Sequence, residues 1–225
     1  DHSFAYASFK AAGLTNMQQV TAFALFFIAF AIKMPIFPLH TWQPDAYDQS
    51  PTSVTMVLSA VMVKMGLYGV MRWLMPLFPD AFSAHSNFVV LLSVIGILYA
   101  SFIAIRQDDM KRLIAYSSIA HIGLMSAALF TNTEIGTQGA LIQLFSHGVN
   151  VLGLWIIADI IEQQTGTRSL KEMGGLAKQN PTLGILLVGF AFANIALPLT
   201  NAFIGEFLMF NGLFQFNHWI AAAAG

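Results

Sequence analysis

The sequence has 225 residues, of which 56% are hydrophobic and 9% are charged. Soluble domains carry about 25% charged residues, so this composition and the mean hydropathy of +0.67 indicate an integral membrane protein. The formal net charge of -1 points to no nucleic-acid partner. The absence of cysteine excludes disulfides and thiolate-bound iron–sulfur clusters in this chain, and neither GxGxxG nor GxxxxGK[ST] occurs.

The chain begins at Asp1 without a signal peptide and ends in a run of alanines before Gly225. We expect both ends to have been cut from a longer protein. Residues 1–18 are mildly polar and favour a loop or a short surface helix.

Six apolar spans follow, at residues 19–37, 52–76, 87–105, 111–130, 137–161 and 181–214. Most reach the ~20 residues that cross a hydrocarbon core. We therefore predict an all-α integral membrane protein with about six transmembrane helices, in a single domain over residues 1–225. Pro35 and Pro38 interrupt the first span and Pro198 interrupts the last, so both helices should be discontinuous. They lie five helices apart and should run in opposite directions, as in inverted-repeat transporters.

Lysine and arginine in the short loops predict the orientation. The turn at 106–112 and the loop at 162–180 each carry three, whereas the loops at 77–86 and 130–137 carry none. The two basic loops should therefore face the cytoplasm. Arg72 is the exception and could snorkel to the opposite interface.

Five protonatable residues fall near the middle of these spans: Lys33, Lys64, His121, His147 and Glu206. Counted at 1.5 Å per residue, each lies roughly 15–20 Å from a membrane face. A lysine at this depth costs roughly 2.5–3.5 kcal/mol, so such residues usually serve a function. We hypothesise that the five form a row that passes protons from helix to helix, parallel to the membrane.

Polar residues recur at helical spacing beside these groups, which favours a hydrated interface between helices. The sets are Gln143, His147 and Asn150; Ser117 and His121; and Lys64 and Tyr68. Purely structural interpretations stay open: the lysines could form ion pairs between helices, and the histidines could simply bridge helices by hydrogen bonds. We expect Asp159 and Glu162 to be solvated at a helix end, and the charged turn at 106–112 to serve mainly for orientation.

Six motifs identify a resemblance that runs from about Phe26 to Gly212. They are KMPIFPLHTWQPDAYDQSPTS, VMVKMGLYG, DDMKRLIAYSSIAHIG, IQLFSHGV, EMGGLAKQNP and LPLTNAFIGEF. In this order they resemble the antiporter-type membrane subunits of respiratory complex I, and most of all the M chain of bacterial NADH–quinone oxidoreductase.

The resemblance implies that the chain is a fragment of a fourteen-helix subunit, covering about helices seven to twelve. It implies that Lys33 is the lysine of the first broken helix and Lys64 the connecting lysine of the next. His121 and His147 would be the two central histidines. Glu206 would be the acidic residue of the second broken helix, where L- and N-type relatives carry lysine. Tyr47 departs from the pattern, because many relatives carry histidine there.

The resemblance also implies a function: proton translocation coupled to quinone reduction, in a multi-pass subunit of the bacterial inner membrane. Flavin, iron–sulfur clusters and quinone would belong to partner subunits, with no cofactor in this chain, and L- and N-type chains would be its neighbours in the bilayer.

Three other functions are compatible with parts of the pattern. A subunit of a multisubunit sodium/proton antiporter or of a membrane-bound hydrogenase would share most of these motifs. His121 and His147 lie at similar depth and could instead ligate a b-type haem. A structural scaffold without transport is a further alternative.

Overall fold

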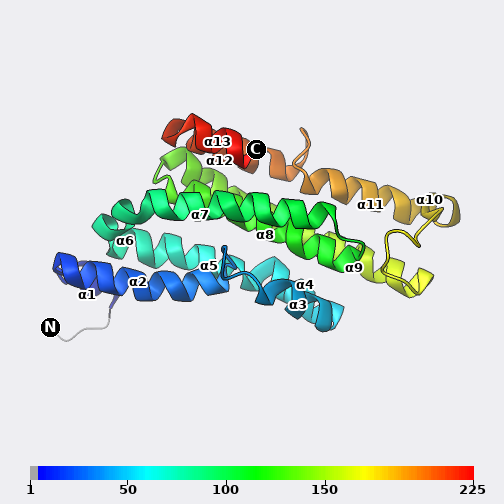
Figure 1. Cartoon of the computed structure of the whole chain (residues 1–225), viewed down its shortest axis with the longest axis horizontal. Coiled ribbons are helices and arrows are strands. Elements are labelled where there is room, and N and C mark those ends of the chain that lie inside the picture. Colours follow the sequence, from blue (N-terminus) through cyan, green and yellow to red (C-terminus); the bar gives the residue numbers. More distant parts are fainter. Residues whose placement is uncertain (1–4) are drawn as a thin grey trace.

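The computed structural model describes residues 5–225, and every regular element among them is a helix. The long helices lie side by side along one axis (Figure 1). In chain order they are α1 (Tyr6–Lys10), α2 (Asn16–Lys33), α3 (Trp42–Gln49), α4 (Thr52–Val57), the π-helical turn η1 (Leu58–Met62), α5 (Lys64–Gly69), the π-helical turn η2 (Val70–Leu74), α6 (Met75–Leu77), α7 (Pro79–Ile105), α8 (Met110–Phe130), α9 (Glu134–Thr165), α10 (Leu176–Gln179), α11 (Pro181–Asn194), α12 (Asn201–Phe216) and α13 (His218–Ala224).

Five helical segments of the described chain are long and apolar enough to cross a membrane. They are α2, the continuous segment Thr52–Leu77, α7, α8 and α9. The helix α11 is apolar but shorter, and α12 follows it after a break. This arrangement confirms the predicted fold of about six membrane-spanning elements, with the first and the last discontinuous.

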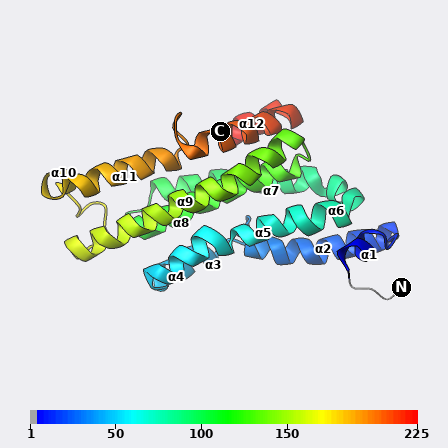
Figure 2. The same ribbon diagram turned by 180° about the vertical axis from the view of Figure 1, so that it is seen from behind.

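The two broken helices lie at opposite edges of the bundle and run in opposite directions. In Figures 1 and 2 the pair α2–α3 forms one edge and the pair α11–α12 forms the other. From α2 to α3 the chain runs toward the end of the bundle where α11 begins, whereas from α11 to α12 it runs away from that end. Both breaks therefore occur in the middle of the bundle, as the proline positions predicted.

Local sequence explains where the long helices begin. Thr15 and Gln18 form a reciprocal capping box at the start of α2. The carboxylate of Asp109 accepts hydrogen bonds from two backbone N–H groups at the start of α8. The side-chain oxygens of Thr133 and Asn180 each accept one at the starts of α9 and α11. Each cap satisfies N–H groups that a helix end would otherwise leave without a partner.

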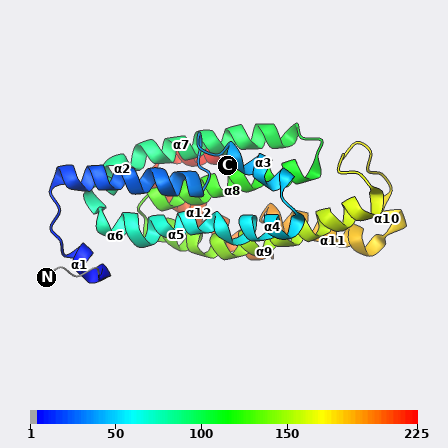
Figure 3. The same ribbon diagram turned by 90° about the horizontal axis from the view of Figure 1, so that it is seen from below.

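Two apolar clusters fill the bundle, one toward each end. The larger cluster includes Phe23, Phe82 and Phe130, and the rings of the last two stack at 4.5 Å between centroids. The smaller cluster surrounds Tyr47 and Trp155, which come from α3 and α9. Seen from below, α2 and α7 lie on one side of the bundle, and α5 and α9 lie on the other (Figure 3).

The two basic loops meet at the same end of the bundle. The backbone N–H of Met110 donates to the carbonyl of Arg168 (3.0 Å), and that of Leu170 donates to the carbonyl of Asp108 (2.7 Å). The turn at 106–112 and the loop after α9 are therefore tied together, as expected if both lie on one side of the membrane. We call this the basic end.

The predicted orientation can be tested with two cysteines on exposed positions, Glu134→Cys and Gly174→Cys. Glu134 starts α9 at the end opposite the basic loops, and a side chain at Gly174 meets no atom within 4 Å. In a cysteine-free full-length subunit, an impermeant maleimide should label Glu134→Cys in intact cells and Gly174→Cys only after lysis. Labelling of both from one side, or the reverse pattern, would show that the orientation is wrong.

Candidate functional site

Lys33 is the last residue of α2 and lies at the first break. The carbonyl of Ile32 accepts a hydrogen bond from the indole N–H of Trp42, the first residue of α3 (3.0 Å). This bond satisfies a backbone group near the break and joins the two halves of the interrupted helix. The side chain of Lys33 is half-buried and has no ion pair or hydrogen bond with residues 5–225.

Lys64 follows the π-helical turn η1 and is 7% exposed. Its ammonium group donates to the carbonyl of Ser59, five residues earlier. Such wide turns inside α-helices often mark functional sites. The predicted pairing with Tyr68 is wrong, because Tyr68 is 54% exposed. Lys64 itself is 7% exposed, so the two side chains lie in different environments.

Two close helix contacts place Lys64 between the first break and α9. A Cβ added at Gly66 would lie 2.7 Å from the backbone nitrogen of Met34, directly after Lys33. A Cβ added at Gly148 would lie 3.1 Å from the carbonyl oxygen of Ala60, in η1. The helix that carries Lys64 therefore packs against the end of α2 on one side and against the turn of α9 that carries His147 on the other.

His147, His121 and Glu206 form a compact group from α9, α8 and α12. The rings of His121 and His147 lie 5.0 Å apart between centroids. The Nδ1 atom of His121 lies 3.2 Å from Oε1 of Glu206, and the amide nitrogen of Gln143 donates to the same oxygen at 3.2 Å. The predicted His121, His147 and Glu206 thus share one site, and Gln143 holds the carboxylate beside His121.

The polar stripes of α8 and α9 face the second break. Asn150 donates to the carbonyl of Ala193 at 2.9 Å, and Ser146 donates to the carbonyl of Asn201 at 3.0 Å. Asn194 at the end of α11 donates to the hydroxyl of Ser117 at 3.0 Å. Asn150 and Ser146 thereby satisfy carbonyl groups on both sides of the interruption, which water would satisfy in a soluble protein.

The break itself has an unusual backbone, since Ala196 and Leu199 have φ angles of 52° and 82°. Residues other than glycine seldom adopt this left-handed region, and each such residue costs roughly 1–3 kcal/mol. The conformation persists only where its surroundings hold it, and the bonds from α8 and α9 fix the residues on either side of it, Ala193, Asn194 and Asn201.

A cavity of about 530 Å³ opens onto the group. Glu206, His121, Ser117 and Ser101 contribute its polar wall, and the side chains of His121 and Glu206 are 16% and 17% exposed. The carboxylate is therefore held between Gln143 and His121 yet remains accessible from the cavity.

These contacts bring three of the five predicted residues together, and Lys64 lies on the helix that packs against the turn of α9 carrying His147. Lys64, His147, His121 and Glu206 follow one another across adjoining helices, and Lys33 lies at the far end beside the first break. The geometry disfavours a haem between the two histidines. Axial ligands stand on opposite faces of the porphyrin, and rings 5.0 Å apart leave no room for it.

Comparison with known proteins shows the family to which the chain belongs. The family described as NADH:quinone oxidoreductase/Mrp antiporter, TM, matches residues 3–225. The chain belongs to this family.

Relatives of this antiporter family are similar over almost the whole chain. The NADH-quinone oxidoreductase subunit M of Rhodobacter capsulatus is 42% identical over 211 residues, which cover 94% of this chain and 41% of the relative. The subunit M of Escherichia coli strain K12 is 42% identical over 84% of this chain and 37% of its own length. The chain thus spans about two fifths of the curated relatives that it matches.

Solved structures show the same fold. Respiratory complex I from Thermus thermophilus with bound NADH contains a chain that is 32% identical, with a TM-score of 0.91 over 96% of this chain and 46% of that one. The Mrp complex from Dietzia sp. DQ12-45-1b gives a TM-score of 0.90 over 100% of this chain and 42% of that one. At 22% identity this second similarity shows the fold alone.

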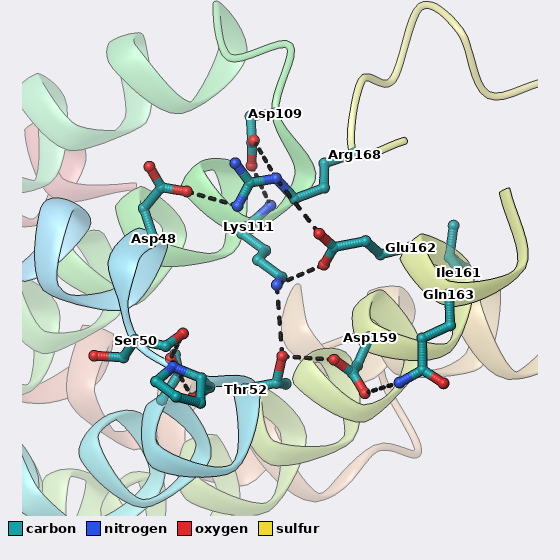
Figure 4. A network of polar contacts seen from close by, with 12 residues as sticks. Asp48, Ser50, Thr52, Asp109, Lys111, Asp159, Ile161, Glu162, Gln163 and Arg168 are labelled. Atoms are coloured by element: carbon teal, nitrogen blue, oxygen red, sulfur yellow. Dashed lines mark hydrogen bonds and ion pairs between the residues drawn. The ribbon is translucent and has the colours of Figure 1, made fainter. Parts of the chain in front are cut away.

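A charged cluster at the basic end was not predicted from the sequence (Figure 4). Lys111 is only 8% exposed, and its Nζ lies 2.5 Å from Oε2 of Glu162. Asp159 accepts from the hydroxyl of Thr52 at 2.6 Å. The expectation that Asp159 and Glu162 are merely solvated is wrong, because α4 and α8 bring partners that lie far away in the sequence.

Close packing of α9 against α12 brings Glu206 to Gln143 and His121. A Cβ added at Gly139 would lie 2.7 Å from the backbone nitrogen of Met209, so Gly139→Ala must separate the two helices. We expect the free energy of unfolding to fall by about 1–3 kcal/mol, measured as a lower thermal midpoint in detergent. Gly189→Ala is the control, because no atom lies within 4 Å of a Cβ there. Equal midpoints for both variants would contradict the close approach.

Proposed function

We propose that this chain is the central part of a proton-translocating membrane subunit of an NADH-quinone oxidoreductase. The observation that carries the proposal is the contact of Glu206 with His121 and Gln143, beside His147 at the second helix break. Relatives named subunit M, at 42% identity over most of the chain, support this function.

The proposed path runs parallel to the membrane, from Lys33 through Lys64, His147 and His121 to Glu206. His121 can donate a proton to the carboxylate of Glu206 across the 3.2 Å contact. His147 lies between this pair and the helix that carries Lys64. Water is the natural bridge where two of these groups are too far apart for a direct hydrogen bond.

Electrostatic coupling links the protonation states of neighbouring groups in the row. Two unit charges ~10 Å apart interact by about 1.7 kcal/mol at an effective dielectric constant of ~20. A proton on His147 therefore disfavours a second cation at Lys64, while the carboxylate of Glu206 favours a cation on His121. Moving one proton at the end of the row changes the proton affinity of the next group.

The energy for this transport would come from partner subunits. We propose that flavin, iron–sulfur clusters and quinone chemistry reside in those partners, with L- and N-type antiporter-like chains as neighbours in a bacterial inner membrane. Among residues 5–225, no group of three or more His, Cys, Asp or Glu side chains is placed to bind a metal ion.

A sodium/proton antiporter subunit is the second candidate, because the family description covers both kinds of complex. The structural similarity to the Mrp complex supports it at the level of the fold. The relatives named subunit M, at 42% identity, favour the first candidate.

Substitutions at Glu206 test the proposed role. Glu206→Gln keeps the volume but cannot ionise, so it should strongly reduce proton translocation, whereas Glu206→Asp should retain part of it. We expect Glu206→Lys to be worse than Glu206→Asp, because a cation would repel protonated His121, whose Nδ1 lies 3.2 Å from the present carboxylate. Proton uptake by inverted vesicles, normalised to assembled complex, measures the effect.

The matched control is Glu134→Gln, the same chemical change at an exposed position in the first turn of α9. It should leave proton uptake unchanged. If the Gln, Asp and Lys variants of Glu206 all pump as well as this control, Glu206 is a packing residue and the proposed relay is wrong.

A further inference from the structure

Arg72 lies at the end of the bundle opposite the basic loops, near the end of the segment Thr52–Leu77. The helix α6, which follows it, and the turn between α8 and α9 lie at this end (Figure 1). The guanidinium carbon of Arg72 lies 4.2 Å from the centroid of the Tyr6 ring, and this ring meets Trp73 edge to face at 5.4 Å. Tyrosine and tryptophan concentrate where a membrane meets water, so this group marks the interface at that end.

The charge of Arg72 is not balanced by a carboxylate of the described chain. None of the ion pairs among residues 5–225 includes it. Two carboxylates at the same end bind elsewhere, since Asp80 accepts from Gln19 (3.4 Å) and Glu134 from Gln138 (3.1 Å). Contact with the face of the tyrosine ring leaves the N–H groups of the guanidinium able to bind two oxygens of a phosphate side by side.

A pocket of about 440 Å³ opens beside Arg72, between the segment Thr52–Leu77 and the start of α9. Its polar wall consists of Arg72, Tyr68, Asn132 and Thr137, and its apolar wall includes Leu141. None of the described residues that line the pocket is acidic. The pocket therefore combines one cation with neutral hydrogen-bonding groups, which is the chemistry that binds an anion.

Exposed apolar residues lead from this pocket toward the middle of the bundle on both helices. Met65 and Val61 precede Tyr68 by three and seven residues, and Leu141 and Phe145 follow each other by one turn on α9. All four apolar side chains are exposed, Phe145 by 76%. We call these residues the two apolar stripes.

The stripes have the length of one acyl chain. They end where the two helices meet, because a Cβ added at Gly148 would lie 3.1 Å from the carbonyl oxygen of Ala60. From Thr137 at the pocket to Gly148 the helix rises about 16 Å. One leaflet of a bilayer contributes about 15 Å of hydrocarbon. The pocket and the stripes thus match the headgroup and the tail of one lipid.

We propose that Arg72, Asn132 and Tyr68 bind the phosphate of an anionic phospholipid whose acyl chain lies along the two apolar stripes. Arg72 supplies the charge and paired N–H groups, and the amide of Asn132 and the hydroxyl of Tyr68 supply further donors. A zwitterionic headgroup is disfavoured, because no carboxylate lines the pocket to bind its ammonium group. The site lies at the membrane interface, away from the midplane row, and does not depend on the proton translocation proposed above.

Photo-crosslinking lipids test the site in the assembled full-length complex, reconstituted in nanodiscs. The two probes are phosphatidylglycerol and phosphatidylcholine, each with a diazirine on its acyl chain. Label within residues 68–76 and 132–145, located by mass spectrometry, should favour the phosphatidylglycerol probe by about fivefold, as expected for about 1 kcal/mol from one arginine at a membrane surface. Equal label from both probes would overturn the proposal. So would the absence of label from both, because it would show that protein covers the pocket.

Substitutions of Arg72 separate a specific site from an arginine that only snorkels to the headgroup level. Arg72→Gln should remove the preference for phosphatidylglycerol, whereas the control Arg106→Gln, at an exposed arginine of the opposite end, should leave it unchanged. Arg72→Lys keeps the charge but cannot bind phosphate through paired N–H groups, so the preference should fall in part. An unchanged preference in Arg72→Lys or in Arg72→Gln would contradict the site.

Discussion

A backbone carbonyl or N–H group inside a membrane needs a partner within the protein, because the hydrocarbon core offers none. Both interrupted helices of this chain depend on this constraint. The indole of Trp42 satisfies the carbonyl of Ile32 at the first break, and Asn150 and Ser146 satisfy carbonyls at the second. The side chains that satisfy the breaks also make the middle of the bundle polar. The same constraint therefore shapes the two interrupted helices and the surroundings of the candidate proton path.

The same polar interior makes ionisable residues tolerable at this depth. Glu206 contacts His121 and Gln143, and Lys64 reaches the carbonyl of Ser59 beside a π-helical turn. Removing one partner from such a group costs more than the contact itself contributes, because the remaining group stays buried and unsatisfied. The arrangement is therefore sensitive to single changes, as expected of a path in which each proton transfer alters the next group.

Much of this could be predicted from the sequence. Prolines inside apolar spans placed both breaks, and i, i+4, i+7 spacing placed Gln143, His147 and Asn150 on one face. Pairings between distant segments could not be predicted. The burial of Lys111 depends on Glu162, 51 positions later in the chain, and on Thr52. The exposure of Tyr68 depends on how α5 packs against α2 and α9, which its spacing from Lys64 does not determine.

The central claim is that the row needs a charge between its two broken helices, and Lys64→Met tests it most directly. Methionine keeps the volume and the apolar stem of lysine but cannot carry a proton. In assembled full-length complex, the ratio of protons translocated to electrons transferred should fall, while Lys178→Met, at an exposed lysine, should leave it unchanged. A normal ratio in Lys64→Met, with assembly verified, would show that no charge is required there and would contradict the relay.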